Sequence, residues 1–178
     1  MKNILIIGNK GKLLNTIYSQ LISENKFEVS ILYFDIVESR FLNNVDIFNS
    51  EYDIREINVI IYCGGEVRDR SHMLNRNYII PKIIVDYCIE EKITFYYLSS
   101  LSVYEYFFQN IEISELSIRN AKINYYGITK KLLDDYVELN SNILNYAILK
   151  PASIIGSKRL SSSLDKIIKI FIKYKFLK

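Results

Sequence analysis

The stretch NILIIGNKGKLLNTIYSQLI (residues 3–22) joins a short apolar run to an amphipathic segment through two glycines. The run at residues 4–7 ends at Gly8 and is typical of a strand buried on both faces of a parallel sheet. The segment after it repeats apolar residues at helical spacing, namely Leu13, Ile17, Leu21 and Ile22. A glycine turn between a strand and a helix lets the backbone approach a pyrophosphate, whose negative charge is favoured at a helix N-terminus. The stretch therefore predicts a nucleotide-binding strand–turn–helix unit.

Strand and helix patterns alternate along the rest of the chain. Further strands are expected in EVSILYFD (residues 28–35), NVIIYCGG (58–65), ITFYYLSS (93–100) and LNYAILKP (144–151). Helices are expected at residues 72–92 and at residues 126–139, and Pro81 predicts a kink or an irregular start in the first of them. This order predicts an α/β fold with a doubly wound, Rossmann-like parallel sheet in a three-layer α/β/α arrangement.

Composition excludes several classes of function. The net charge of +3 and the scattered lysines argue against nucleic acid as a partner. No segment approaches the roughly 18 apolar residues of a membrane span, so stable membrane insertion is not expected. Cys63 and Cys88 lack metal-ligand spacing and lie in apolar surroundings. We expect two buried free thiols, no metal site and a reducing, cytoplasmic location.

We expect one domain at residues 1–156, followed by a C-terminal helix at residues 157–178. The tail SSSLDKIIKIFIKYKFLK (residues 161–178) has apolar residues at helical spacing, and Ser162 and Asp165 resemble a helix start. Packing on the sheet is the favoured interpretation. A helix lying on a membrane surface and an exposed start of something longer stay open.

Asp35 ends the second predicted strand. A carboxylate at this place accepts hydrogen bonds from the ribose hydroxyls of a dinucleotide and repels a 2′-phosphate. With the glycine turn before it, Asp35 favours NAD as the cofactor. Arg68, Arg70 and Arg76 flank the lone His72 and are interpreted as a polar helix start rather than as diphosphate contacts.

These segments, in this order, resemble the extended short-chain dehydrogenases/reductases, specifically the NAD-dependent epimerase/dehydratase group that acts on nucleotide sugars. The resemblance covers residues 1–156. GNKGKLL (residues 8–14) is similar to the family's GxxGxxG, with Leu14 replacing the third glycine. YLSSLSVYEY (97–106) resembles SSxSVYG with Glu105 for glycine, and ILKPASIIG (148–156) resembles LRPxNVYG with Lys150 for arginine and Ser153 for asparagine.

The resemblance implies roles for individual residues. It implies Ser100, Tyr126 and Lys130 as catalytic residues, and Ser100, Tyr126 and Ser153 as substrate contacts. It implies an NAD site formed by Gly8, Lys10, Gly11, Leu13, Asp35, Asp46, Cys63, Gly64, Gly65, Asn77, Ser99, Tyr126, Lys130 and Pro151. Tyr125 competes with Tyr126 as the phenol, but its spacing of five residues to Lys130 turns it off the shared helix face.

Tyr126 and Lys130 stand four residues apart and face the same way on a helix. A tyrosine has an ordinary pKa near 10. For it to act as a base at neutral pH, this pKa must fall by about 3 units, which corresponds to roughly 4 kcal/mol of phenolate stabilisation. Lys130 and the positive nicotinamide of NAD are the expected sources.

Three functions stay open at this point. The first is an NAD-dependent epimerase, dehydratase or dehydrogenase of a nucleotide sugar. The second is a truncated, non-catalytic NAD-binding protein or subunit, because family members continue into a smaller substrate domain and only about 22 residues follow Gly156 here. The third is an NADPH-preferring reductase of another small carbonyl compound, against which Asp35 argues. By resemblance we also expect a homodimer through the helices near residues 75–91 and 121–139.

Overall fold

A computed structural model describes residues 2–43, 48, 56–104 and 125–151. Over these residues the sheet has five strands in the order β2-β1-β3-β4-β5, and every neighbouring pair is parallel. The strands are β1 (Lys2–Gly8), β2 (Phe27–Tyr33), β3 (Ile57–Tyr62), β4 (Thr94–Leu98) and β5 (Tyr146–Leu149). The strand order reverses between β1 and β3, which is where ligands bind in open sheets of this kind.

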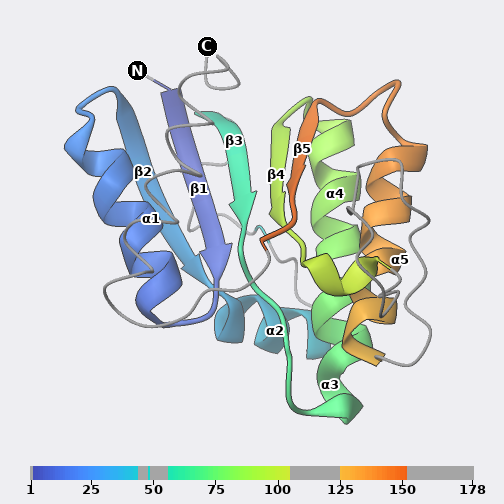
Figure 1. Cartoon of the computed structure of the whole chain (residues 1–178). Helices are drawn as coiled ribbons and strands as arrows, with labels where there is room; N and C mark the ends of the chain where they lie inside the picture. The colour runs from blue at the N-terminus through green and yellow to red at the C-terminus, as the bar shows by residue number, and fades with distance from the viewer. Residues whose placement is uncertain (1, 44–47, 49–55, 105–124, 152–178) are drawn as a thin grey trace, which may run out of the picture.

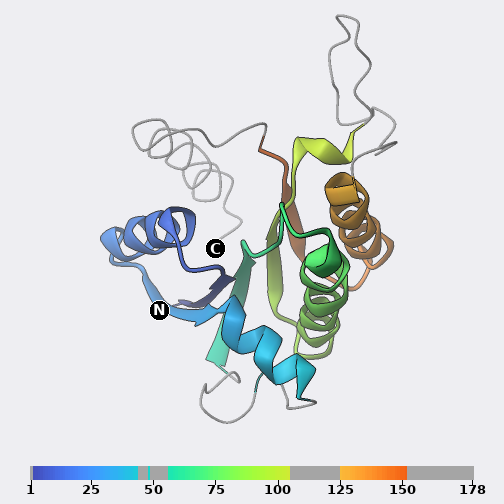
Figure 2. The same ribbon diagram turned by 90° about the horizontal axis from the view of Figure 1, so that it is seen from below.

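Helices cover both faces of the sheet, as Figures 1 and 2 show. They are α1 (Lys12–Ser23), α2 (Phe34–Leu42), α4 (Ile80–Glu90) and α5 (Tyr125–Leu139), whereas the short α3 (Arg70–Leu74) packs against α5 and the turn before α4. One core joins α1 to strand residues such as Ile4 and Ile6. The other joins α2, α4 and α5 to strand residues such as Leu5 and Ile7. Alternate strand residues therefore feed two apolar layers, and the predicted three-layer α/β fold is confirmed.

The core face of α1 differs in part from the prediction. Leu14, Ile17 and Leu21 are buried, whereas Ile22, which was expected beside them, is 41% exposed. A Cβ added to Gly8 would lie 3.2 Å from Leu14 Cδ1. Leu14 therefore packs directly against the glycine that ends β1, and this contact fixes which side of the helix faces the sheet.

The expected irregularity near Pro81 is a π-helical turn, η2 (Asn75–Ile79), between α3 and α4. Proline has no backbone N–H and its ring crowds the preceding turn, so a widened turn before it relieves the contact. The helical segment also begins earlier than expected, at Arg70 rather than at His72. Asp69 caps it by accepting a hydrogen bond from the Ser71 N–H at 3.0 Å.

Both cysteines are free, as predicted, but only Cys88 is fully buried; Cys63 is partly exposed. Within the part of the chain that the structure describes, no helix has the length and apolar character to cross a bilayer. The same residues contain no cluster of side chains suited to a metal ion. Asp46, Glu105, Ser153 and the tail at residues 157–178 lie outside the described residues.

Candidate functional site

A cavity of about 320 Å³ opens at the carboxyl ends of β3 and β4, beside the start of α1. Nine residues that the sequence had singled out line it: Leu13, Cys63, Gly64, Gly65, Ser99, Ser100, Tyr126, Lys130 and Pro151. Val67 and Leu98 line it as well and were not predicted. Gly8, Lys10, Gly11, Asp35 and Asn77 are not among its lining residues.

The two glycines of the first turn have different surroundings. A Cβ on Gly8 would lie only 2.5 Å from Cys63 Sγ, so a side chain here would displace the Cys63 thiol. A Cβ on Gly11 would meet nothing within 4 Å. Gly11 also precedes α1 without a side-chain cap, and the first turn of α1 has no acidic residue. The turn thus leaves open space and backbone N–H groups, which suit a diphosphate.

The second strand ends two residues before Asp35, whereas the sequence predicted that Asp35 is its last residue. β2 ends at Tyr33, and Asp35 belongs to the first turn of α2. The Lys10 ammonium lies 3.2 Å from its carboxylate, and the two side chains are 65% and 62% exposed. Lys10 also lies over the Tyr33 ring, 4.9 Å from its centroid. An acid and a base of the proposed NAD site are therefore paired with each other at the end of β2.

Asn77 holds the loop after β3 instead of lining the cavity. It is fully buried in the π turn, and its Oδ1 accepts a hydrogen bond from the Glu66 N–H at 2.8 Å. Its amide nitrogen donates to the Glu66 carbonyl at 2.9 Å and to Thr129 Oγ1 in α5 at 3.0 Å. The loop that carries Gly64 and Gly65 is in this way tied to the helix that carries Tyr126 and Lys130.

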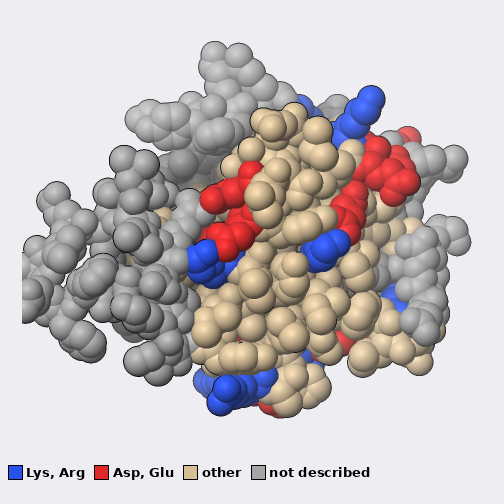
Figure 3. Space-filling view, turned by 90° about the vertical axis from the view of Figure 1, so that its right-hand side faces the viewer, with Lys and Arg blue, Asp and Glu red and all other residues tan. Residues whose placement is uncertain are grey.

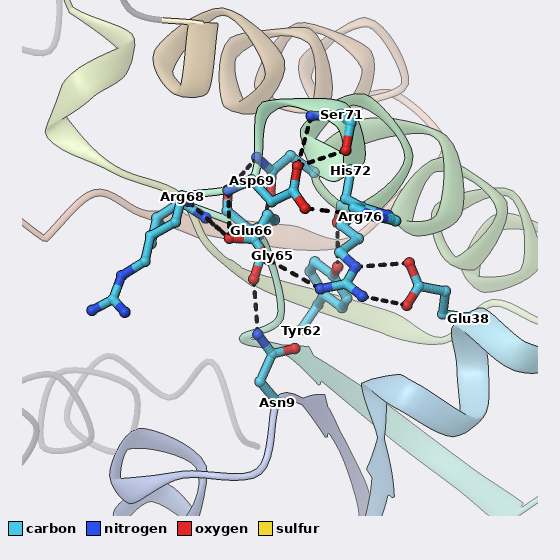
Figure 4. A network of polar contacts seen from close by, with 12 residues as sticks. Asn9, Glu38, Tyr62, Gly65, Glu66, Arg68, Asp69, Ser71, His72 and Arg76 are labelled. Atoms are coloured by element: carbon cyan, nitrogen blue, oxygen red, sulfur yellow. Dashed lines mark hydrogen bonds and ion pairs between the residues drawn. The ribbon is translucent and has the colours of Figure 1, made fainter.

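A second set of contacts, which we term the loop clamp, also holds this loop (Figure 4). One oxygen of Glu66 accepts from the backbone N–H groups of residues 67, 68 and 69, at 2.9, 2.8 and 3.2 Å. The other oxygen of Glu66 forms an ion pair with Arg76 at 3.0 Å. Arg76 also forms a bidentate ion pair with Glu38 of α2, with both hydrogen bonds at 2.7 Å. Arg76 is therefore held by two carboxylates, whereas the Arg68 side chain extends away from the clamp.

We expect Glu66→Gln to lower the free energy of unfolding by about 1 kcal/mol at pH 7. Hydrogen bonds from the loop backbone, together with Arg76, lower the pKa of the Glu66 carboxyl. A carboxyl whose pKa is lower in the folded state stabilises the fold above its unfolded pKa and ceases to do so as the pH falls through the folded pKa. Urea unfolding should thus separate the two proteins at pH 7, and the difference should shrink as the pH falls through the folded pKa of Glu66. A difference that does not change with pH would contradict the clamp, and Glu24→Gln on the surface is the control.

Lys130 is buried, at 3% exposure, at the centre of the site. Its ammonium donates to the carbonyls of Gly64 at 3.2 Å and Leu98 at 3.3 Å, which are located at the ends of β3 and β4. It also lies over the Tyr97 ring, 4.8 Å from the centroid. Burial lowers the pKa of Lys130 to about 8, against an opposing effect of Asp134 and Cys63.

Tyr126 is partly buried one helical turn before Lys130, and Ser100 follows β4 as the cap of a short 3₁₀ turn, η3 (Leu101–Val103). Burial raises the pKa of the Tyr126 phenol, its hydrogen bond with Ser100 lowers it, and Asp134 raises it. The protein groups thus leave the pKa above the ordinary value, and the lowering that we expected from Lys130 is not seen. Tyr125 faces elsewhere, with Arg70 stacked 4.8 Å from its ring centroid.

Sequence reasoning missed several residues that organise the site. Glu38, Glu66 and Asp134 are the main ones, since they bind the loop, fix Arg76 or influence the charges of Tyr126 and Lys130. Of these, only Asp134 had a local signal, because a residue four places after Lys130 faces the same way on a helix.

Comparison with known proteins is consistent with this geometry. A model of the NAD dependent epimerase/dehydratase family matches residues 7–174. A dTDP-4-dehydrorhamnose reductase from Yersinia enterocolitica aligns with a TM-score of 0.66 at 22% identity, over 98% of this chain and 61% of that one. A UDP-glucuronic acid 4-epimerase from Bacillus cereus, solved in complex with NAD, aligns with a TM-score of 0.64 at 19% identity, over 83% and 56%. A dTDP-4-dehydrorhamnose reductase from Clostridium acetobutylicum gives 0.65 at 20% identity, over 93% and 60%.

At these identities the structural alignments establish the fold. This chain spans between 48% and 61% of the length of the solved structures that it matches. The family's description also names NAD, the cofactor that the sequence had suggested.

Proposed function

Because this chain belongs to the NAD dependent epimerase/dehydratase family, we propose that it binds NAD at the cavity and acts on a nucleotide sugar through Ser100, Tyr126 and Lys130. The observation that carries the proposal is the position of Lys130. It is buried between the ends of β3 and β4, one helical turn from Tyr126, and both side chains line the same cavity as Ser100.

The residues around the first turn fit a dinucleotide. The open space at Gly11 and the uncapped start of α1 suit its diphosphate, and the Asp35 carboxylate suits a ribose hydroxyl. Gly64, Gly65 and Ser99 line the cavity where the nicotinamide half would lie. Asp46 and Ser153 remain proposals by resemblance. When bound, NAD supplies a hydride acceptor.

The chain's own residues would handle the substrate proton. Ser100 would hold the reacting oxygen through its hydroxyl, and Tyr126 would take the proton from that oxygen. Lys130 would hold the nicotinamide ribose. The protein groups keep the phenol protonated, so we propose that the positive nicotinamide supplies the stabilisation that the phenolate needs.

Calorimetry with NAD and a panel of nucleotide sugars, followed by turnover assays on those that bind, tests the proposal. Heat of binding for both ligands and conversion of one sugar nucleotide would support it. Failure to bind NAD would refute the cofactor site, and binding without any turnover would support the second candidate below.

The second candidate is a nucleotide-binding protein without turnover. The observation that favours it is the phenol of Tyr126, whose pKa burial and Asp134 hold above the ordinary value. A phenol that stays protonated in the NAD complex could not act as a base at neutral pH.

Asp35→Asn is expected to weaken the preference for NADH over NADPH by about tenfold, or 1.4 kcal/mol. The substitution removes the charge that repels a 2′-phosphate and leaves Lys10, now without its acid, to attract one. Fluorescence titration with both reduced cofactors measures the ratio. Glu28→Gln, a surface change in β2, serves as the control, and an unchanged ratio in Asp35→Asn would remove Asp35 from the ribose site.

We also propose a homodimer through α4 and α5. Ile83, Ile128 and Leu132 on these helices are 37%, 40% and 39% exposed. The face seen in Figure 3 is largely uncharged, with acidic and basic groups next to one another. Light scattering should give twice the 21.0 kDa chain mass. Charged substitutions at Ile83 and Leu132 should return it to the monomer value, and a wild-type protein that is already monomeric would contradict the proposal.

A further inference from the structure

A buried ion pair lies behind the residues that line the cavity. Asp134 is fully buried on α5, and the Lys150 ammonium lies 3.5 Å from its carboxylate, with only 7% of the Lys150 side chain exposed. Lys150 follows β5 and precedes Pro151, which lines the cavity. Its ammonium also lies over the Tyr104 ring, 5.1 Å from the centroid. Both charges are thus removed from water next to the site.

The helix places this pair in line with the proposed catalytic groups. Asp134 comes four residues after Lys130 and eight after Tyr126, so all three share one face of α5. The groups that face Lys130 come from three elements: the Cys63 thiol after β3, the Tyr97 ring in β4, and Asp134 in α5. Among these three, Asp134 is the group whose ordinary pKa lies below neutral pH.

A buried lysine keeps its charge only if its surroundings favour the ammonium. The carbonyls of Gly64 and Leu98 do this only in part, because a neutral amine can also donate hydrogen bonds to them. A carboxylate one helical turn away acts directly on the charge. The same reasoning applies to Asp134, which needs a cation to remain ionised in the core.

We propose that Asp134 is a positioning residue that holds Lys130 in its ammonium form beneath the cavity, and that Lys150 holds Asp134 in its ionised form. The catalytic role of these residues rests on the proposed function, whereas the electrostatic coupling of Lys150, Asp134 and Lys130 is a property of the folded chain. The effects on the pKa values agree, since Asp134 raises the pKa of Lys130 against its burial. Asp134 also raises the pKa of Tyr126, so its charge acts on both groups that precede it on this face of α5.

The test measures the titration of Lys130 by NMR on protein with ¹³C-labelled lysine, with its signal identified by Lys130→Arg. The unmodified protein should give a pKa near the value of about 8 that burial produces. Asp134→Asn should lower it by about one unit or more. Lys150→Met should lower it as well, because Asp134 then takes up a proton, and Lys150→Arg should restore the original value.

The matched controls are Asp135→Asn and Lys131→Met, which break the neighbouring ion pair one residue along α5, on its partly exposed side. Neither should move the Lys130 signal. If Asp134→Asn leaves the pKa of Lys130 unchanged, the inference is wrong. A rise in that pKa in Lys150→Met would show that Asp134 stays ionised without Lys150 and would overturn the role of Lys150.

A single substitution here leaves one buried charge and can prevent folding. The double variant Asp134→Asn, Lys150→Met removes both charges together and should fold. Its Lys130 pKa should also lie below that of the unmodified protein, and equality would overturn the inference. Because the titration uses neither NAD nor substrate, its outcome is independent of the turnover experiments.

Discussion

Tyr126→Phe is expected to reduce turnover of a nucleotide sugar by about a thousandfold, because it removes the hydroxyl that would take the substrate proton. The aromatic ring stays in place, so the cavity wall formed with Ser100 and Lys130 is kept. Binding of NADH, measured by fluorescence, should change by less than about threefold, or 0.7 kcal/mol. The loss should therefore appear in kcat.

The neighbouring residue provides a matched control for this variant. Tyr125→Phe removes the same hydroxyl one position earlier, from a ring that stacks on Arg70 rather than lining the cavity. Its turnover should remain within about twofold of the unmodified protein. Equal losses in the two variants, or full activity in Tyr126→Phe, would exclude Tyr126 as the base.

Gly65→Ala is expected to lower the free energy of unfolding by about 3 kcal/mol. Gly65 has a φ of 147°, which residues with a side chain rarely adopt. An added Cβ would also lie 2.8 Å from Asn77 Oδ1 and 3.0 Å from Lys130 Nζ. Neither neighbour can withdraw freely, because Asn77 is bonded to the backbone of Glu66 and Lys130 to two carbonyls. Chemical unfolding monitored by circular dichroism gives the value.

Gly11→Ala is the control, because the same substitution at that position should lower the affinity for NADH and leave the stability of the fold nearly unchanged. Gly11 is in an extended conformation with a φ of 166°, and a Cβ would meet no atom within 4 Å. Its stability should change by less than about 1 kcal/mol, while NADH affinity falls by about tenfold if a diphosphate occupies that space. A stable Gly65→Ala protein would contradict the packing described for the loop after β3.

The strands and the glycine turn could be predicted because their signals are local. An apolar run ending in glycine encodes both the buried strand and the close approach at Gly8, and the structure contains both. Asp35 was misplaced for the same reason. The apolar pattern of β2 continues through Phe34, which is buried but already belongs to α2, so the pattern alone could not show where the strand ends.

The contacts that shape the site are long-range and had weaker signals. Glu38, Glu66 and Arg76 are far apart in the sequence and look like ordinary surface charges until the fold brings them together. Asp134 and Asp135 are adjacent and identical, yet one is fully buried and the other pairs with Lys131 at the surface. Only the position around the helix axis relative to Lys130 distinguishes them. Lys150, which completes the buried pair, follows β5 and carries no such helical signal.

The widened turn before α4 has a consequence for how the chain tolerates changes in length. A π turn contains about one residue more than a regular helical turn, so removing one residue between positions 75 and 79 would restore a regular helix. Everything before the deletion would then rotate by about 100° about the helix axis. Asn77 and the segment that it anchors would no longer face each other. A deletion of one residue in this helical segment would in this way break the link that Asn77 makes between the loop after β3 and α5, the helix that carries Tyr126 and Lys130.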